Sequence, residues 1–469
     1  MSQLSPSFLQ ALTGALGQDA VLTGNAIPDH CHTDWSRISP LAPQALLRPT
    51  DTSQVAAALR LCHAHRVPVV PQGGLTGLTG GAVPSPGAVA LSLARMNRIE
   101  AVDPVGRTIT VQAGATLQAV QEAAHAAGCI FGVDLAARGS CQIGGNLSTN
   151  AGGNGVVQFG MMREQALGLE AVLADGSVLD MMRPLYKNNT GYDLKHWFIG
   201  AEGTLGIITR AILRLQPAPR ARATALAAVP DCNSALALLG RLQARAPGGV
   251  AAFELMWRDF LNLALACIHA PAPFGNEYPL VVLTDLTGTD EAELQVVLED
   301  VLGEAMAEGL ALDAVLAQSQ AQAASLWRIR EATAELPPEM ALINFDISLP
   351  RAELGDFADR CIEALARRWP GHRSLRFGHL GDGNLHLSTD ANSLGGMSFE
   401  QAQHEVESIV YGLVARAGGS ISAEHGVGLH KKPYLGASRS PAEMTAMRAI
   451  KHALDPLGLL NPGKVFDLA

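Results

Sequence analysis

The stretch from Arg138 to Gly153 constrains this chain more than any other, because it is long, almost uncharged and built of small residues. After Arg138 it carries no charged side chain, and Gly, Ser, Thr, Asn and Ala make up most of it. Small residues let a ligand approach the main chain closely, and glycine permits the positive φ values that turn successive N–H groups toward one point. The stretch therefore predicts a backbone nest for an anion such as a pyrophosphate. A pair of glycine-rich surface turns is the alternative.

Two further glycine-rich stretches favour the nest. Residues 71–81 follow an apolar run, Val67 to Val70, that is typical of a short strand, and residues 199–209 form the third stretch. Three such loops predict a long ligand that is held along its whole length. No Gly-Lys-Ser/Thr follows any of them, so none is a P-loop, and none is a G-x-G-x-x-G that opens a helix.

Together these segments resemble the FAD-binding domain of the vanillyl-alcohol oxidase/p-cresol methylhydroxylase flavoproteins, in the branch that holds D-2-hydroxyglutarate and D-lactate dehydrogenases. The resemblance extends from about Asp34 to Lys464. It implies an α+β fold, with a two-subdomain FAD-binding domain of the p-cresol methylhydroxylase type and an α+β substrate (cap) domain. Covalent members of the family have a His after the Gly-Gly of the first loop. Leu75 stands there in this chain, which implies non-covalent FAD.

The resemblance also implies which residues contact the cofactor. They come from the three loops and from one position near the C-terminus, where Asn461 is otherwise a turn residue before Pro462. The expected FAD-binding residues are Pro71, Gln72, Gly73, Gly74, Leu75, Thr76, Gly77, Gly139, Ser140, Gly144, Gly145, Asn146, Thr149, Asn150, Gly152, Glu202, Gly206, Ile207, Ile208 and Asn461.

Length and proline positions predict the domain boundaries. A chain of 469 residues is too long for one core, so two or three domains are expected. Pro217 and Pro219 mark a linker. We expect an FAD-binding domain over residues 1–217 (core about 42–217), a substrate and metal domain over 218–430, and a C-terminal helical segment, 431–469, that returns to the FAD domain.

Charge and cysteine usage exclude several classes of protein. The net charge of −10 argues against a nucleic-acid partner. The seven cysteines include no C-x-x-C pair, which argues against an iron–sulfur cluster or a zinc ribbon, and their odd number indicates free thiols. Arg37 is the only Lys or Arg among the first forty residues, so no signal or transit peptide is expected, and no apolar run is long enough to span a membrane. A cytoplasmic location is therefore the expectation.

The stretch from Arg376 to Leu387 reads as a β-hairpin. If Asp382-Gly383 is a two-residue type I′ loop, His379 lies directly opposite His386, with Cβ atoms ~5 Å apart. Both imidazoles could then reach one metal ion. Two histidines on a partly buried sheet are the alternative.

The stretch from Ser422 to Gly428 adds a carboxylate and a third imidazole, Glu424 and His425. Two His and one Glu leave positions open on a divalent ion, as a catalytic site requires. Adjacent strand residues point to opposite faces, so the two side chains can share a site only on an irregular backbone, which nearby glycines permit. The resemblance implies that His379, His386 and Glu424 are the ligands of the metal, with Zn²⁺ the expected ion, and that His425 is the general base.

The expected substrate residues are Arg330, Thr333, Asn344, Ser388 and Arg376. Arg330 matches an arginine that binds the substrate carboxylate in the resembling enzymes, and a solvated helix arginine is the alternative. Those enzymes have a Lys where this chain has Asn344 and an Asn where it has Ser388, and their Thr is Ala334 here, next to Thr333. Arg376 is a guess at a replacement for the lost positive charge.

These features predict an FAD-dependent dehydrogenase that oxidises a D-2-hydroxy acid (D-2-hydroxyglutarate-like, D-lactate or D-malate) to the 2-oxo acid. The metal would assist deprotonation of the hydroxyl, and the C2 hydride would pass to the flavin. Two rivals are an oxidase or transferase of the same flavin fold, and a metal-dependent hydrolase with purely structural glycine loops. The electron acceptor stays open between an electron-transfer flavoprotein and a quinone, and a homodimer is one assembly left open.

Overall fold

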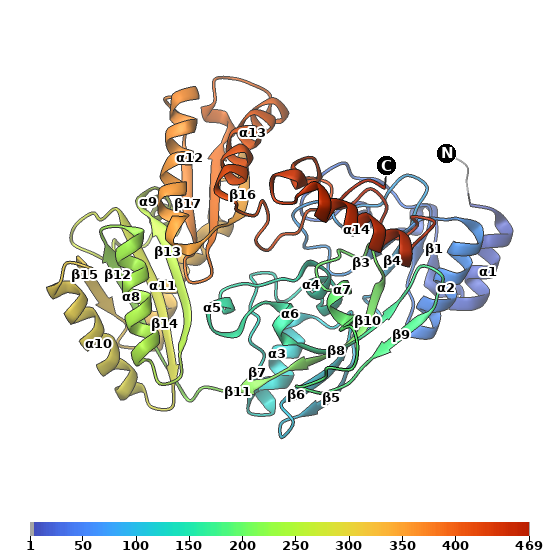
Figure 1. Cartoon of the computed structure of the whole chain (residues 1–469), viewed down its shortest axis with the longest axis horizontal. Coiled ribbons are helices and arrows are strands. Elements are labelled where there is room, and N and C mark those ends of the chain that lie inside the picture. The colour runs from blue at the N-terminus through green and yellow to red at the C-terminus, as the bar shows by residue number, and fades with distance from the viewer. Residues whose placement is uncertain (1–3, 469) are drawn as a thin grey trace. The chain divides into compact units, whose positions relative to one another are not determined.

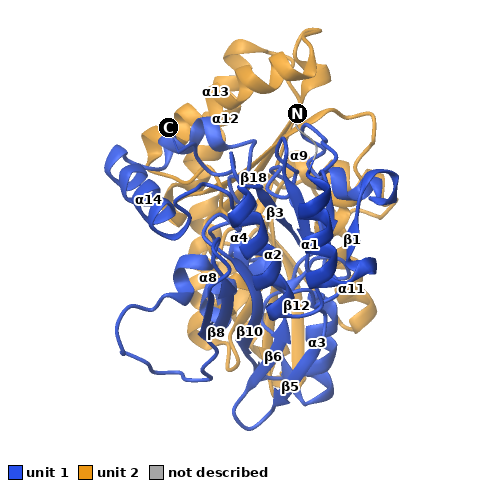
Figure 2. Ribbon diagram, turned by 90° about the vertical axis from the view of Figure 1, so that its right-hand side faces the viewer, with its two compact units in different colours: residues 1–153, 160–218, 424–469 blue, residues 154–159, 219–423 orange. Residues whose placement is uncertain are grey.

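The computed structural model describes residues 4–468, and its chain divides into two compact units (Figures 1 and 2). Unit 1 comprises residues 1–153, 160–218 and 424–469, and unit 2 comprises residues 154–159 and 219–423. The chain thus leaves unit 1 twice, and it enters unit 1 for the last time between Ala423 and Glu424. Each unit is described here by itself.

Unit 1 contains a four-stranded sheet in the order β1-β2-β4-β3 and a five-stranded antiparallel sheet in the order β5-β6-β10-β8-β9, with a short β7–β11 pair beside them. In the smaller sheet, β2, β4 and β3 run parallel. The strands are β1 Val21–Leu22, β2 Leu46–Leu47, β3 Val69–Gln72, β4 Val89–Ser92, β5 Ile99–Asp103, β6 Thr108–Gln112, β7 Cys129–Ile130, β8 Ala166–Val172, β9 Val178–Met181, β10 Ile207–Arg214 and β11 Gln216–Pro217.

Helices cover these sheets and bury a large apolar core, and a smaller cluster is formed by Ile27, Cys31, Leu46 and Ala90. The helices of unit 1 are α1 Pro6–Leu16, α2 Thr52–His65, α3 Leu117–Ala126, α4 Ile143–Thr149, α6 Met162–Gln165, α7 Lys195–Phe198 and α14 Pro441–Leu454. Helix α2 shows why such segments fold: Val55, Leu59 and Cys62 recur on one face and are buried, and Asp51 caps the first turn by accepting from the N–H of Gln54.

The central small-residue stretch is partly helical. Residues 143–149 form α4, which ends at Asn150 in the left-handed conformation, with φ of 53°. The prediction of a loop was therefore wrong over these residues. Small side chains are compatible with a helix that packs closely: a Cβ on Gly144 would lie 2.8 Å from the Cβ of Ala113, which directly follows β6.

Unit 2 is built on a seven-stranded antiparallel sheet in the order β15-β12-β14-β13-β17-β18-β16. Helices α9 and α11 pack on the face that carries Met256 and Phe377. Helices α12 and α13 contact β18 and β16 at the other end of the sheet (Figure 1). The strands are β12 Ala221–Val229, β13 Val250–Trp257, β14 Leu280–Gly288, β15 Asp313–Leu316, β16 Leu342–Ser348, β17 Ser374–His379 and β18 Asn384–Asp390.

The helices of unit 2 are α5 Val156–Phe159, α8 Cys232–Arg245, α9 Arg258–Cys267, α10 Glu291–Ala307, α11 Gln320–Glu331, α12 Leu354–Arg368 and α13 Phe399–Ala417. The 3₁₀ helices of the chain are η1 Gln18–Ala20, η2 Gly24–Ala26, η3 Asp29–His32, η4 Ala332–Glu335, η5 Arg351–Glu353, η6 Ala391–Ser393 and η7 Lys432–Ala437. Within residues 4–468, no helix is both long and apolar enough to cross a membrane.

The β17–β18 hairpin exists, but its predicted register was wrong. Residues 380–383 form a four-residue turn, so His379 pairs with Asn384 and His386 pairs with Phe377. The register differs by two residues from the prediction. Because side chains alternate with a period of two, this shift leaves His379 and His386 on the same face of the sheet. Their ring centroids lie 5.4 Å apart.

Candidate active site

A cavity in unit 1 is lined by all three glycine-rich stretches and by the segment that begins at Glu424. We call it the glycine-lined pocket. Strand β3 leads into the first stretch and strand β10 follows the third, so the ends of two sheets fix the pocket walls. Close backbone packing needs glycine here: a Cβ on Gly74 would lie 2.0 Å from the carbonyl oxygen of Ser140.

Three amide oxygens that belong to residues of the pocket lining have no hydrogen-bond partner within the described chain. They are Oε1 of Gln72, Oε1 of Gln142 and Oδ1 of Asn461. The amide nitrogen of Gln72 donates to Cys31 and Ala82, which fixes the orientation of this amide. A buried acceptor without a donor costs about 1–3 kcal/mol. The lining therefore suits a ligand that brings N–H and O–H donors, as the ring imide and ribityl hydroxyls of a flavin do.

Glu202 and Asn461 connect the pocket wall to the C-terminal part of the chain. The amide nitrogen of Asn461 donates to the backbone carbonyls of Gly81 and Glu202 at 3.0 and 2.7 Å. The Glu202 carboxylate accepts from the backbone N–H groups of Val427 and Gly428 at 2.7 and 2.8 Å. Burial raises the pKa of Glu202, and these two N–H groups oppose that rise.

A second polar group lies on the sheet face of unit 2. Glu254 of β13 is fully buried; its Oε1 lies 2.6 Å from Nδ1 of His379, and its Oε2 accepts from Nε of Arg330 at 2.8 Å. Burial alone would raise the pKa of Glu254, but His379 and Arg330 outweigh that effect and lower it below its usual value. The guanidinium of Arg330 also stacks over Phe377, 4.8 Å from the ring centroid.

Asp346 of β16 holds the segment that carries Glu424 and His425. Its buried carboxylate accepts from the side chain of Asn384 at 2.9 Å and from the backbone N–H of Ala423 at 3.1 Å. Backbone bridges to Ser420 and Ser422 extend this pairing along the edge of the sheet. Since His425 follows Ala423 by only two residues, the chain itself keeps its imidazole close to Asp346.

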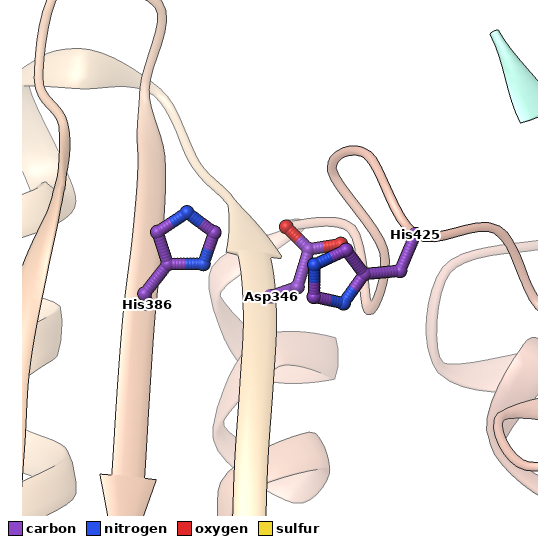
Figure 3. Close-up of side chains that lie close together, drawn as sticks. All are labelled: Asp346, His386 and His425. Carbon is purple, nitrogen blue, oxygen red and sulfur yellow. The ribbon is translucent and has the colours of Figure 1, made fainter. Parts of the chain in front are cut away.

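Ligand atoms of Asp346, His386 and His425 lie within 4.8 Å of one another (Figure 3). Two imidazoles and one carboxylate form a donor set that divalent transition metals accept, with coordination positions left open. The arrangement can therefore hold a metal ion. Of the three predicted ligands, His379, His386 and Glu424, this group contains His386. It also contains His425, the predicted base.

Two family descriptions match this chain. The FAD binding domain matches residues 43–182, and the C-terminal domain of FAD linked oxidases matches residues 218–465. A D-2-hydroxyglutarate dehydrogenase of Xanthomonas citri pv. viticola is 41% identical over 443 residues, which cover 94% of this chain and 92% of that protein.

The chain belongs to the FAD-linked oxidases. Within them it falls in the D-2-hydroxyglutarate dehydrogenase branch of the vanillyl-alcohol oxidase/p-cresol methylhydroxylase fold, as predicted. The mitochondrial D-2-hydroxyglutarate dehydrogenase of Rattus norvegicus is 36% identical, covering 95% of this chain and 83% of that protein. A putative mitochondrial D-lactate dehydrogenase of Schizosaccharomyces pombe is 34% identical, covering 99% and 90%.

The fold also matches a solved structure of p-cresol methylhydroxylase with substrate bound. The TM-score is 0.77 at 17% identity, covering 98% of this chain and 97% of that one, which supports the fold alone. Family membership makes the chain an FAD-dependent dehydrogenase and removes the metal-dependent hydrolase as an alternative. Several relatives are mitochondrial, so the cytoplasmic location stays a prediction.

Most residues predicted to contact FAD line the glycine-lined pocket of this FAD-linked oxidase. The predicted residues in the lining are Pro71, Gln72, Gly73, Gly74, Leu75, Thr76, Gly77, Gly144, Gly145, Asn146, Thr149, Glu202, Gly206, Ile207, Ile208 and Asn461. Gly139, Ser140, Asn150 and Gly152 lie outside that lining. Ser140 packs its carbonyl against Gly74, and Asn150 ends α4 and accepts from the backbone of Arg163.

The predicted substrate residues are spread over unit 2. Asn344 and Ser388 are cross-strand partners on the face of His386, and Ser388 Oγ donates to Asn344 Oδ1 at 2.6 Å. Arg330 is buried against Glu254, whereas Thr333 is exposed in η4.

The placement of Arg376 contradicts the guess that it replaces a lost positive charge beside Asn344. It lies between Phe377 and Leu375 on β17, so its side chain points to the sheet face opposite His379. There it forms ion pairs with Asp259 and Asp359.

Sequence patterns did not predict several residues that the fold brings to these sites. Glu254 stands in an apolar strand, where a lone buried carboxylate is a recognisable signal of a paired or functional group. Asp346 has the same signal in β16. No sequence pattern predicts that Trp35 lines the glycine-lined pocket, because long-range packing places it there. Gln142 lies within the small-residue stretch that predicted the nest, but its side chain was not singled out.

Proposed function

We propose that this FAD-dependent dehydrogenase oxidises a D-2-hydroxy acid to the 2-oxo acid, using non-covalently bound FAD and a divalent metal ion. The observation that carries the proposal is the position of His425. His425 lines the glycine-lined pocket, and a nitrogen of its imidazole lies within 4.8 Å of ligand atoms of Asp346 and His386. A histidine with both of these properties can serve as the base when a hydroxyl is oxidised to a carbonyl.

FAD, when bound, accepts the two electrons that leave the substrate carbon with the hydrogen. The residues of this chain then have three tasks. His425 takes the hydroxyl proton on its imidazole, because histidine titrates near working pH. His386, with His379 and Glu424, supplies ligands for the metal, and two imidazoles with one carboxylate suit Zn²⁺. Arg330 offers the remaining N–H groups of its guanidinium to the substrate carboxylate.

Asp346 competes with Glu424 as the carboxylate ligand. The carboxylate of Asp346 already accepts hydrogen bonds from Asn384 and Ala423. Glu424 Oε1 accepts one from the backbone N–H of Gly153 at 3.3 Å, a longer and weaker contact. We propose that Glu424 is the carboxylate ligand, as the resemblance implies, while Asp346 positions the segment that carries Glu424 through its contact with Ala423. Metal titrations of Glu424→Gln and Asp346→Asn test this: only Glu424→Gln should weaken binding of the metal directly.

We expect the substrate side chain to lie beside His386, where Asn344 and Ser388 carry no charge. Ser388 donates its hydroxyl to Asn344, neither of which carries a charge, and Arg330 forms an ion pair with Glu254. A second substrate carboxylate would therefore lack an unpaired cation, which favours 2-hydroxy acids with one carboxylate, as in D-lactate, over dicarboxylic ones.

Anaerobic mixing with paired D- and L-2-hydroxy acids tests the function. We expect D-enantiomers to bleach the visible absorbance of the bound flavin and L-enantiomers to leave it unchanged. Equal bleaching by both enantiomers, or no bleaching by any member of a broad panel, would refute the proposal. Rapid oxygen consumption during turnover would instead favour an oxidase.

A further inference from the structure

We propose that Glu202 is a positioning residue that fixes the orientation of His425, and not only a residue of the FAD-binding wall. The inference rests on the proposed role of His425 as the base. It concerns residues of unit 1 alone, because Glu202 and the whole segment from Glu424 onward belong to that unit. Nothing in the sequence links these two stretches, which are separated by more than two hundred residues.

The first support is the hydrogen bonding of the Glu202 carboxylate. Each of its oxygens accepts one backbone N–H, Val427 on Oε1 at 2.7 Å and Gly428 on Oε2 at 2.8 Å. Such bidentate, charge-assisted contacts are short and directional. They fix the backbone only two and three residues beyond His425, so the side chain of Glu202 determines the path that the chain takes away from the imidazole.

The second support is the absence of side chains where the segment approaches Glu202. Gly426 has φ of +81°, and a Cβ there would lie 3.0 Å from Cδ of Glu202. Gly428 has φ of +53°, and a Cβ there would lie 2.2 Å from the carbonyl oxygen of Thr79. Only glycine allows both the left-handed backbone and this close packing. Gly426 and Gly428 thus allow the segment after His425 to pack closely against Glu202 and Thr79.

The third support is the conformation of Glu202 itself. Its φ is 51°, in the left-handed region that residues other than glycine rarely adopt. The surrounding chain holds it there: its N–H donates to the carbonyl of Ser148 at 2.8 Å, and its carbonyl accepts from the side chain of Asn461 at 2.7 Å. Such conformations persist only where the surroundings over-determine them, and they cluster at functional sites.

A second clamp acts on the other side of the same segment. Thr79, in the first glycine-rich stretch, donates from its hydroxyl to the carbonyl of His425 at 3.3 Å, and its own carbonyl accepts from the N–H of Leu429 at 2.8 Å. His425 is therefore held between residues of the first and third stretches, both of which line the glycine-lined pocket. Because the same backbone segments line the pocket and hold His425, binding of FAD and alignment of the base are coupled.

The test compares Glu202→Ala, Glu202→Gln and a matched control, Glu170→Gln. Glu170 is as buried as Glu202, at 8% exposed for each, and lies in the same unit. Its carboxylate accepts from the hydroxyls of Thr52 and Thr209, not from the His425 segment. A general loss of stability from removing a buried charge therefore affects both sites, whereas loss of positioning affects only Glu202.

The first measurement is hydrogen exchange of FAD-loaded protein, which needs no substrate. We expect Glu202→Ala to speed exchange at Val427 and Gly428, Glu202→Gln to do so less because one acceptor remains, and Glu170→Gln to leave these amides unchanged. Unchanged exchange in Glu202→Ala would overturn the proposal. If exchange responds but wild-type flavin is reduced by no 2-hydroxy acid, the positioning contact stands and the proposed function fails.

The second measurement is anaerobic flavin reduction by the best substrate. Misplacement of a base by about 1 Å can cost roughly 100-fold in rate. We expect Glu202→Ala to lower the limiting reduction rate roughly 10- to 100-fold, with the Kd values for substrate and FAD changed far less, and Glu170→Gln to reduce flavin at nearly the wild-type rate. A rate loss that only mirrors weaker FAD binding would make Glu202 a cofactor residue and overturn the proposal.

Discussion

Glu254 and His379 lie 2.6 Å apart, carboxylate oxygen to Nδ1, on neighbouring strands β13 and β17. A carboxylate at Nδ1 keeps that nitrogen protonated and leaves Nε2 of the ring available as a ligand. Glu254 therefore decides which nitrogen of His379 faces the proposed metal, while its other oxygen binds Arg330. One buried carboxylate thus couples a predicted metal ligand to a predicted substrate residue.

Glu254→Gln should weaken metal binding by about 10- to 100-fold, the usual effect of losing an outer carboxylate behind a ligating histidine. Metal titration of the FAD-loaded protein measures it. Asp285→Asn is the matched control, because Asp285 is an equally buried carboxylate of the same sheet that binds Thr224 and Trp327 instead. Equal metal affinity in wild type and Glu254→Gln would contradict the assignment of His379 as a ligand.

Removal of the metal, by chelation or by His386→Ala, should abolish reduction of the flavin by substrate. The spectrum of the bound flavin should stay largely intact, because the glycine-lined pocket is formed by residues of unit 1 and His386 belongs to unit 2. Stopped-flow absorbance after verified metal removal, and after adding the metal back, gives the answer. Unchanged reduction rates without metal would refute the metal's role.

Acid precipitation should release all of the flavin into the supernatant. Leu75 occupies the position of the linking histidine of covalent members, and the pocket offers backbone and amide groups rather than a nucleophile at that point. Absorbance of the supernatant and of the redissolved pellet measures the two fractions. Yellow colour that remains with the denatured protein would show a covalent link that Leu75 cannot make.

Asn344→Lys should raise kcat/KM for dicarboxylic D-2-hydroxy acids by roughly an order of magnitude, because each ~1.4 kcal/mol is tenfold. The new ammonium group would stand beside Ser388, on the same sheet face as His386. The ratio of kcat/KM for a dicarboxylic and a monocarboxylic substrate measures the change. Arg376→Ala is the control and should leave that ratio unchanged, since Arg376 points to the opposite face. An unchanged ratio in Asn344→Lys would show that the substrate side chain does not lie beside residue 344.

The stability of the fold should rise in alkaline solution through Lys464. Burial lowers the pKa of Lys464 to about 8, despite the opposing attraction of Asp34. Below pH 8 this lysine is charged in both states, so its buried charge destabilises the fold by about 3 kcal/mol. Between pH 8 and the ordinary lysine pKa of 10.5 the folded state releases the proton first, and the cost disappears.

Unfolding free energies of wild type and Lys464→Met at pH 7 and pH 10 test this. The wild type should gain stability relative to Lys464→Met as the pH rises, because the variant has no proton to release. Parallel changes in the two proteins would show that Lys464 titrates normally in the folded state.

Local patterns in the sequence were enough for many elements and for the chemistry of the chain. The apolar face of Thr52 to Arg66 predicted α2, and the segment from Pro441 to Leu454 matches α14, with Ser440 and Glu443 forming its capping box. The glycine-rich stretches and the two histidine motifs are each formed by residues that are close in sequence. Through their resemblance to a known family they point to the flavoproteins and single out His386 and His425, without any knowledge of long-range packing.

The sequence did not predict the register of the β17–β18 hairpin or which distant side chains pair with each other. The hairpin turn near Asp382 proved to be four residues long, since the turn residues of the chain permit either length and the pairing of a whole sheet selects one. Arg376 and His379 are three residues apart on one strand, so alternation alone sends them to opposite faces. Only the fold shows that Arg376 pairs with Asp259 and Asp359 there.

What the sequence by itself determined is which chemical groups the chain has and which short segments are glycine-rich, helical or extended, because spacing and side-chain type act over a few residues. What only the tertiary structure decided is which distant groups meet: Glu254 with His379, Asp346 with Ala423, and Glu202 with the backbone beyond His425. These contacts arise because packing the sheets brings segments together that are far apart in the chain, and each buried carboxylate must then find a donor.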